Sequence, residues 1–265
     1  SGYPLKFNKL DADYNADVVS WLAYLRSRML QENKFLLINT AQSFIMNLSY
    51  YQNFAAGGVT AEHIQRFDGV SQGYNDYQTL ISYVKSIVSI NGIVDLYGSP
   101  CYYGPSQYTR GNYINAKERY KMWALASYYV LKESSPSLGK VYFNPTLCFN
   151  RSSVNKLEFM NEWIDAYEIN VGTPVSDSYV ISQGSGSDVN CLYMDYKIFA
   201  RNYTNSIMLV RVKDQYFCND FGNNSGVNIT LPSSMRLLYS NGALSNKTDS
   251  ILIRNGEAAI MFYSR

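Results

Sequence analysis

The sequence has little charge and almost no histidine, and each shortage excludes a class of function. Charged residues make up 17% of the 265 residues, against about 25% in an average protein, and the formal net charge is +2. Nucleic-acid-binding proteins carry a basic stripe or patch, so this balance argues against nucleic acid as a partner. His63 is the one histidine, and no Cys-x-x-Cys pair is present. A metal centre built on two or three histidines is therefore excluded, and we expect neither a metal nor a cofactor.

Other motifs are missing as well. No apolar run approaches the ~18 residues of a membrane-spanning helix, so we expect no membrane span. Gly57-Gly58 lacks the lysine of a phosphate-binding loop, and no G-x-S-x-G elbow accompanies His63 for a serine triad. The chain begins Ser1-Gly2 with no apolar signal segment, which indicates a processed product or a piece of something longer.

Tyrosine and glycosylation sequons are plentiful. The chain has 25 tyrosines, a composition that covers a surface with hydroxyl groups rather than ions. Asn-x-Ser/Thr sequons lie at Asn47, Asn150, Asn202, Asn223, Asn228 and Asn246. Together these features predict an extracellular protein, either secreted or on a cell or virion surface.

Helix-like and strand-like segments alternate through the first part of the chain. Apolar residues recur at helical spacing in segments 13–30, 74–88, 114–133 and 153–168. Short apolar runs with polar borders, which are typical of buried strands, lie at 34–40, 58–62, 92–98 and 140–144. This alternation predicts an α/β domain over residues 1–171, with about four parallel strand-plus-helix units, which is half of an eight-unit barrel.

The pattern changes at Gly172-Thr173-Pro174. Beyond it, seven or eight short alternating runs are separated by turns such as Asn241-Gly242 and Asn255-Gly256. This pattern predicts an antiparallel β-sandwich over residues 172–265.

The order of motifs resembles the second half of a (β/α)8 glycoside hydrolase. KFLLINT, GGVTAEH, NAKERYKMWALASYYVLKE, KVYFNP and a helix leading to GTP follow one another. They are similar to the glycosidase-like barrels related to the endo-galactosaminidases. The segment FARNYTNSIMLVRV at 199–212 resembles the start of the β-domain that follows such barrels.

The resemblance implies a glycan substrate or ligand. It also implies that the first four strands are missing here, so a second polypeptide, or another copy of this chain, would complete the barrel and cover its open edges.

Two carboxylates are candidates for glycosidase chemistry, which needs one acid and one nucleophile or base. Glu62 follows a predicted strand and corresponds, by the resemblance, to the family's glutamate. The alternative is a solvated loop glutamate beside His63, or a carboxylate at a helix N-terminus. Asp95 is expected at the end of the next strand as the second carboxylate or as an acceptor for a sugar hydroxyl. A turn residue that caps the following loop is the alternative for Asp95.

Polar and aromatic residues near the predicted strand ends are candidates for sugar binding. Asn39 and Tyr97 lie at two strand ends, and Tyr102 and Tyr103 follow the second. Sugar rings stack on aromatic faces, and amide and hydroxyl groups bind sugar hydroxyls. The alternative for Asn39 is capping of the following loop. The alternative for the tyrosines is a general surface preference, because tyrosine is common throughout the chain.

The four cysteines allow three pairings, and free thiols in a reducing compartment are a further alternative. Cys101 and Cys148 each follow a predicted strand by a few residues. Neighbouring parallel strands end on the same side, which favours a Cys101–Cys148 bridge. Cys191 and Cys218 would then pair within the sandwich.

Two functions remain open from the sequence. The first is an extracellular glycoside hydrolase-like protein that hydrolyses or binds glycans. The second is a non-catalytic virion or cell-envelope surface protein, an adhesin or a structural component, that uses the barrel remnant for binding or assembly.

Overall fold

The computed structural model describes residues 12–34, 38–39, 59–61, 74–89, 91–97, 110–144, 163–188, 191–212, 226–254 and 257–264. Its helices are α1 (Ala12–Gln31), α3 (Tyr74–Ser89) and α4 (Arg110–Leu131), followed by the short 3₁₀ helix η3 (Asp165–Glu168). The strands of the first half are β1 (Ile38–Asn39), β2 (Val59–Ala61), β3 (Ile93–Tyr97) and β4 (Lys140–Asn144). Those of the second half are β5 (Tyr179–Asp188), β6 (Cys191–Asn202), β7 (Ser206–Arg211), β8 (Val227–Leu238), β9 (Leu244–Ile253) and β10 (Ala258–Tyr263).

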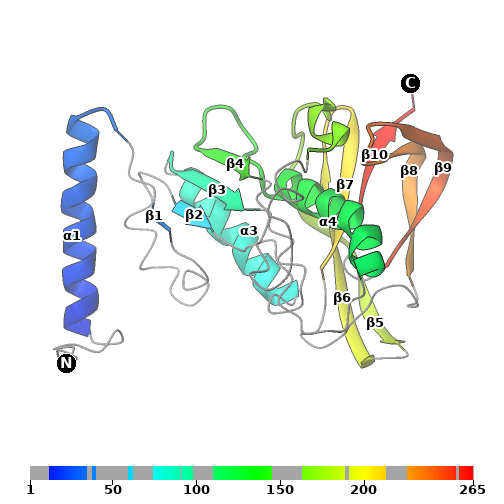
Figure 1. The fold of residues 1–265 in the computed structure, drawn as a ribbon, viewed down its shortest axis with the longest axis horizontal. Helices are drawn as coiled ribbons and strands as arrows, with labels where there is room; N and C mark the ends of the chain where they lie inside the picture. Colours follow the sequence, from blue (N-terminus) through cyan, green and yellow to red (C-terminus); the bar gives the residue numbers. More distant parts are fainter. Residues whose placement is uncertain are drawn as a thin grey trace.

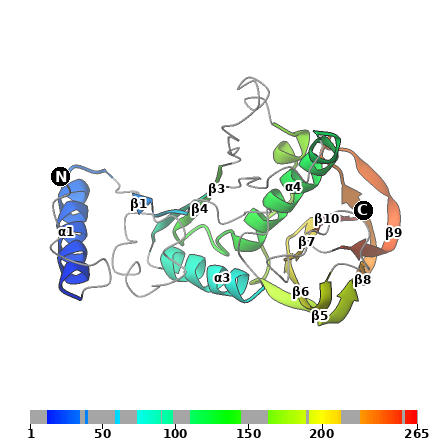
Figure 2. The same ribbon diagram turned by 60° about the horizontal axis from the view of Figure 1, so that its bottom comes forward.

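The first four strands form a small sheet in the order β1-β2-β3-β4, and each neighbouring pair is parallel. Helix α3 precedes β3, and the buried Val94 and Leu96 of β3 belong to the same core cluster as the α3 residues Leu80 and Ile87. Helix α1 stands apart from this sheet in both ribbon views (Figures 1 and 2) and exposes Trp21 over 59% of its surface.

Asparagine ends two of the helices. Asn33 after α1 and Asn91 after α3 have φ values of 53° and 60°, in the left-handed region. After α3, the amide of Gly92 donates to the carbonyl of Ile87 at 2.9 Å and the amide of Asn91 donates to that of Val88 at 3.1 Å. This pair of bonds is a Schellman motif, which satisfies carbonyls that the helix end leaves open. It turns the chain from α3 directly into β3.

The second half forms one antiparallel sheet in the order β5-β6-β7-β10-β8-β9. Alternate residues of its central strands enter different clusters. Met208 and Val210 of β7 belong to the larger core, while Ile207 and Leu209 belong to a second cluster. Successive residues of a strand point to opposite faces, so both faces of β7 are covered. The sheet curls (Figure 2), and the second cluster joins residues from β6, β7, β8, β9 and β10.

Helix α4 lies between the small sheet and the large one (Figure 1), and it packs against β10, β7, β6 and β4. Its second half is buried around most of its circumference, including Trp123, Leu125, Ala126 and Val130. A helix that is covered on all sides belongs to the interior of a protein. The indole nitrogen of Trp123 donates to the carbonyl of Arg211 at 3.3 Å, which holds the helix on β7.

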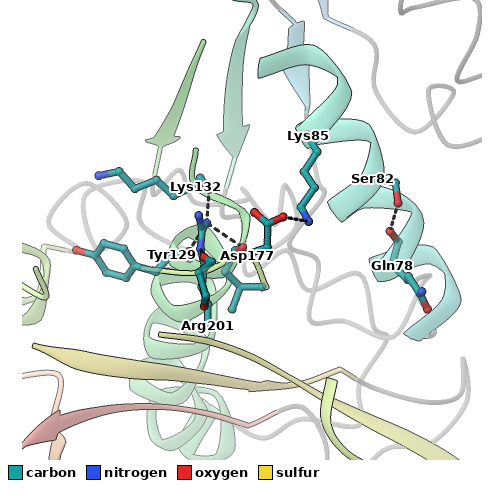
Figure 3. A network of polar contacts seen from close by, with 9 residues as sticks. Gln78, Ser82, Lys85, Tyr129, Lys132, Asp177 and Arg201 are labelled. Carbon is teal, nitrogen blue, oxygen red and sulfur yellow. Dashed lines mark hydrogen bonds and ion pairs between the residues drawn. The ribbon is translucent and has the colours of Figure 1, made fainter. Parts of the chain in front are cut away.

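A buried arginine joins α4 to the large sheet (Figure 3). Arg201 of β6 is 2% exposed, and its guanidinium donates to the carbonyls of Tyr129 and Val130, at 3.3 Å each, and to that of Lys132. Its Nε donates to the carbonyl of Ser176 at 3.0 Å. The cation thus takes the place of water at the C-terminal end of α4, where the helix dipole is negative. On the surface nearby, Lys85 of α3 pairs with Asp177 at 3.2 Å (Figure 3).

The prediction of half a (β/α)8 barrel is wrong. Four parallel strand-plus-helix units are not present among the described residues, and the predicted helix at 153–168 is represented there by the four residues of η3. β1 and β2 have two and three residues. The largest sheet is antiparallel. Helices of a barrel expose one face to water, whereas α4 is buried against the large sheet. The prediction was wrong because a sequence pattern that indicates a helix does not reveal which elements pack around it.

The prediction of a β-sandwich is also wrong in form. A sandwich has two packed sheets, but the described residues after 172 place all six strands in one curled sheet with α4 as the second layer on its outer side. β7 is buried at all six positions, so alternation of polar and apolar residues was a poor guide to its two faces. The boundary near residue 172 stays a prediction, and the larger core includes residues from both sides of it.

Candidate functional site

Asp95 lies in the middle of β3 rather than at its end. In the sheet register it pairs with Thr60 of β2 and Tyr142 of β4, and Thr60 pairs with Asn39 of β1. Asn39 and Asp95 therefore share one row across the small sheet. Tyr142, beside Asp95, is 55% exposed, so this face of the sheet is open among the described residues. Burial raises the pKa of the Asp95 carboxyl above its usual value.

The remaining predicted site residues are only partly described. Tyr97 is the last residue of β3 and pairs with Asn144 of β4. Glu62, Tyr102 and Tyr103 lie outside the described residues. The expected pairing of Glu62 with Asp95 as two catalytic carboxylates therefore stays a prediction.

The cysteine and glycosylation predictions also fall largely outside the described residues. Cys191 begins β6, whereas Cys101, Cys148 and Cys218 lie outside, so neither bridge is seen. Among the sequons, Asn202, Asn228 and Asn246 lie on β6, β8 and β9. Asn47, Asn150 and Asn223 lie outside.

A pocket of about 480 Å³ opens beside β10 and the β8–β9 pair. Three kinds of side chain line it: two cations, three apolar or aromatic groups, and three small polar groups. They are Arg236 and Lys247; Leu244, Phe262 and Tyr263; and Thr204, Asn205 and Ser264. The volume lies within the range of about 300–1,000 Å³ that is typical of small-molecule sites.

Three of the residues that line the pocket form a row across three strands. Phe262 of β10 pairs with Arg236 of β8, and Arg236 pairs with Lys247 of β9. Directly opposite residues in an antiparallel sheet share a face, with Cβ atoms about 4.5–5.5 Å apart. The two cationic side chains are therefore neighbours, with an aromatic ring on the far side of the arginine.

The two cations have no counter-ion in the protein as described. Among the described residues, neither Arg236 nor Lys247 forms an ion pair or a side-chain hydrogen bond. Like charges directly opposite each other destabilise a sheet. An anion bound between them would remove that repulsion and bind two donors at once.

The polar wall of the pocket is held in place by backbone bonds. The amide of Tyr263 donates to the carbonyl of Asn205 at 3.0 Å, which fixes the β6–β7 turn against β10. Burial raises the pKa of Tyr263 above its usual value. The Oγ of Ser264 is buried and has no hydrogen-bond partner among the described residues.

The β8–β9 turn sets the register that brings the cations together. Gly242 has a φ of 77°, and the Oδ1 of Asn241 accepts from the amide of Ala243 at 3.1 Å. The predicted Asn-Gly turn is thus confirmed. Between Arg236 and Leu238 the register shifts, and the Oγ of Ser245 accepts the amide of Leu237 at 2.9 Å. This irregularity places Arg236 opposite Lys247.

The sequence contains only part of the signal for this pair. A two-residue turn at Asn241-Gly242 would place Arg236 opposite Lys247, because both are equally distant from its centre. In the structure the turn lies between Tyr239 and Ala243, and Leu238 pairs with Leu244. The pairing of the two cations therefore depends on the register shift between Arg236 and Leu238, which no short motif reveals.

The chain matches no protein-family model, no curated protein and no solved structure. The expected resemblance to glycosidase-like barrels has no support from these comparisons and is contradicted by the fold. Neither the fold nor the comparisons support a glycoside hydrolase or a secreted protein. Within the described ranges, no group of three or more histidine, cysteine, aspartate or glutamate side chains could hold a metal ion. No described helix is long and apolar enough to cross a membrane.

Proposed function

We propose that this protein is a binding protein and that its pocket beside β10 holds an anionic small molecule. The observation that carries the proposal is the cross-strand pair of Arg236 and Lys247, two cations in one pocket without a counter-ion among the described residues.

Electrostatics and geometry both favour an anion here. A planar guanidinium offers two parallel donors to a carboxylate or sulfate, and an ammonium adds a third from the neighbouring strand. Both cations are exposed, so they are reached from solvent without any opening of the fold. Their attraction for an anion is therefore screened by salt, and binding is expected to weaken as ionic strength rises.

Sulfate titration, followed by calorimetry at low ionic strength, tests this proposal. We expect Arg236→Gln and Lys247→Gln each to weaken sulfate binding about tenfold, which corresponds to about 1.4 kcal/mol. Arg28→Gln on α1 is the matched control, because it removes the same charge outside the pocket and should leave sulfate binding unchanged. Equal sulfate affinity in all four proteins would show that the pocket is not the site.

A further inference from the structure

We propose that the anion is the carboxylate of an acidic saccharide, so that the pocket recognises a sugar ring as well as a charge. This inference rests on the proposed function and deepens it. The cationic pair alone would suit any small anion. The other walls of the pocket are what point to a sugar.

The first wall is aromatic. Phe262 lies directly beside Arg236 on the same face of the sheet, so a group whose carboxylate meets the guanidinium extends over or beside the phenyl ring. Leu244 adds apolar surface, whereas Tyr263, the next residue of β10, packs against the second cluster on the other face of the sheet. A sugar ring has a face of C–H groups that packs against such surfaces, while inorganic sulfate or phosphate has none.

The second wall carries hydroxyl and amide groups suited to sugar hydroxyls. The Oγ1 of Thr204 accepts a bond from the amide of Thr173 at 3.1 Å, which leaves its own proton available to donate. Thr204 is exposed, so a sugar hydroxyl in the pocket can accept this proton.

These three groups of lining residues come from different elements. The cations come from β8 and β9, Phe262 from β10, and the small polar residues from the β6–β7 turn and the segment after β10. A ligand that meets all three has a charge at one end, an apolar face and hydroxyl groups along its rim. A monosaccharide with a carboxylate has these properties in one ring.

Three probes separate charge recognition from sugar recognition in the full chain. They are acetate, methyl glucoside and methyl glucuronide, which present the carboxylate alone, the ring alone and both. We expect methyl glucuronide to bind at least tenfold more tightly than acetate, and methyl glucoside to bind more weakly than methyl glucuronide by a similar factor.

A substitution in the aromatic wall provides the second measurement. Phe262→Leu keeps an apolar side chain in the partly buried position but removes the ring, and should reduce the advantage of methyl glucuronide over acetate to less than about threefold. Tyr142→Leu on β4 is the control, because it removes an exposed aromatic ring outside the pocket and should leave that advantage intact.

Each outcome has a definite meaning. If methyl glucuronide and acetate bind equally to the unaltered protein, the sugar inference is overturned while the anion site stands. If sulfate and all three probes fail to bind, the sugar inference and the proposed function both fail. If methyl glucoside binds as well as methyl glucuronide, the cations do not recognise the ligand and both ideas fail. The comparison of probes on the unaltered protein holds even if Phe262→Leu does not fold.

Discussion

At the scale of single residues, Asp95 couples stability to pH. Burial on the small sheet raises its pKa above the usual value of 3.8, so the folded protein binds this proton more tightly than the unfolded chain does. Folding stability contributed by such a group is present at low pH. It is lost as pH rises from about 3.8 to the higher pKa of the folded state.

Replacement of Asp95 tests this coupling. Asp95→Asn removes the charge that burial disfavours, so we expect the variant to have a higher melting temperature than the unaltered protein at pH 7. The two should melt at the same temperature at pH 3, where Asp95 is protonated in both states. Melting curves followed by circular dichroism at the two pH values give the answer. An equal difference at both pH values would mean that packing, not charge, is the cause.

The residues of the candidate pocket show where sequence reasoning reached its limit. The Asn241-Gly242 turn could be predicted because each residue has a local conformational preference. The pocket depends on β10, which enters the sheet between β7 and β8 and brings Phe262 beside Arg236. That neighbour is set by strand order, and strand order is a property of the whole sheet rather than of any short segment.

At the scale of elements, the helices were more predictable than their surroundings. The predicted helices at 13–30, 74–88 and 114–133 are confirmed as α1, α3 and α4. Alanine, leucine and methionine raise the helix propensity of α1 and α4, whereas α3 has a single leucine and was predicted from the helical spacing of its apolar residues. Helix propensity does not indicate which element a helix packs against. α4 packs mainly on β7 and β10, about a hundred residues later in the chain.

Arg201 joins α4 to β6 through hydrogen bonds, so its replacement should lower the free energy of unfolding. Arg201→Met keeps the length of the side chain but leaves buried carbonyls at the end of α4 without donors, at a cost of about 1–3 kcal/mol for each unsatisfied group. We expect the free energy of unfolding to fall by about 3 kcal/mol or more. Urea denaturation measures the change.

The matched control for this substitution is Arg254→Met. Arg254 is half-buried, with 41% of its side chain exposed, and its ion pair with Glu257 at 3.7 Å is a partly screened contact worth about 0–1 kcal/mol. A loss of stability no larger for Arg201→Met than for Arg254→Met would show that the buried contacts in Figure 3 are not what holds α4 in place.

At the scale of the whole molecule, one core spans the predicted domain boundary. It contains Leu125 of α4 together with Phe199, Met208 and Ile260 of the large sheet. Without the helix, one face of that sheet would be exposed to water. Each large apolar side chain transferred in this way costs about 1.5–3 kcal/mol.

Expression of residues 172–265 alone tests whether this boundary separates two folding units. We expect the fragment to lack a cooperative thermal transition and to bind a hydrophobic dye strongly, because its outer face has lost α4. The full chain is the control in the same assays. A fragment with sharp, reversible melting and weak dye binding would instead establish an autonomous unit that begins near residue 172.

The position of β10 also bears on how the chain is made in a cell. β10 is the last strand in sequence, yet it lies between β7 and β8 in the large sheet. During translation, the β8–β9 hairpin leaves the ribosome before β10, the strand that will pair with β8, has been made. The edge of β7 that will pair with β10 is unpaired for the same reason. Synthesis proceeds at about 5–20 residues per second, so these edges remain open for seconds while residues 239–263 are added. The nascent protein must therefore avoid wrong strand pairing during that interval, and chaperones that shield exposed edges would matter most at this step.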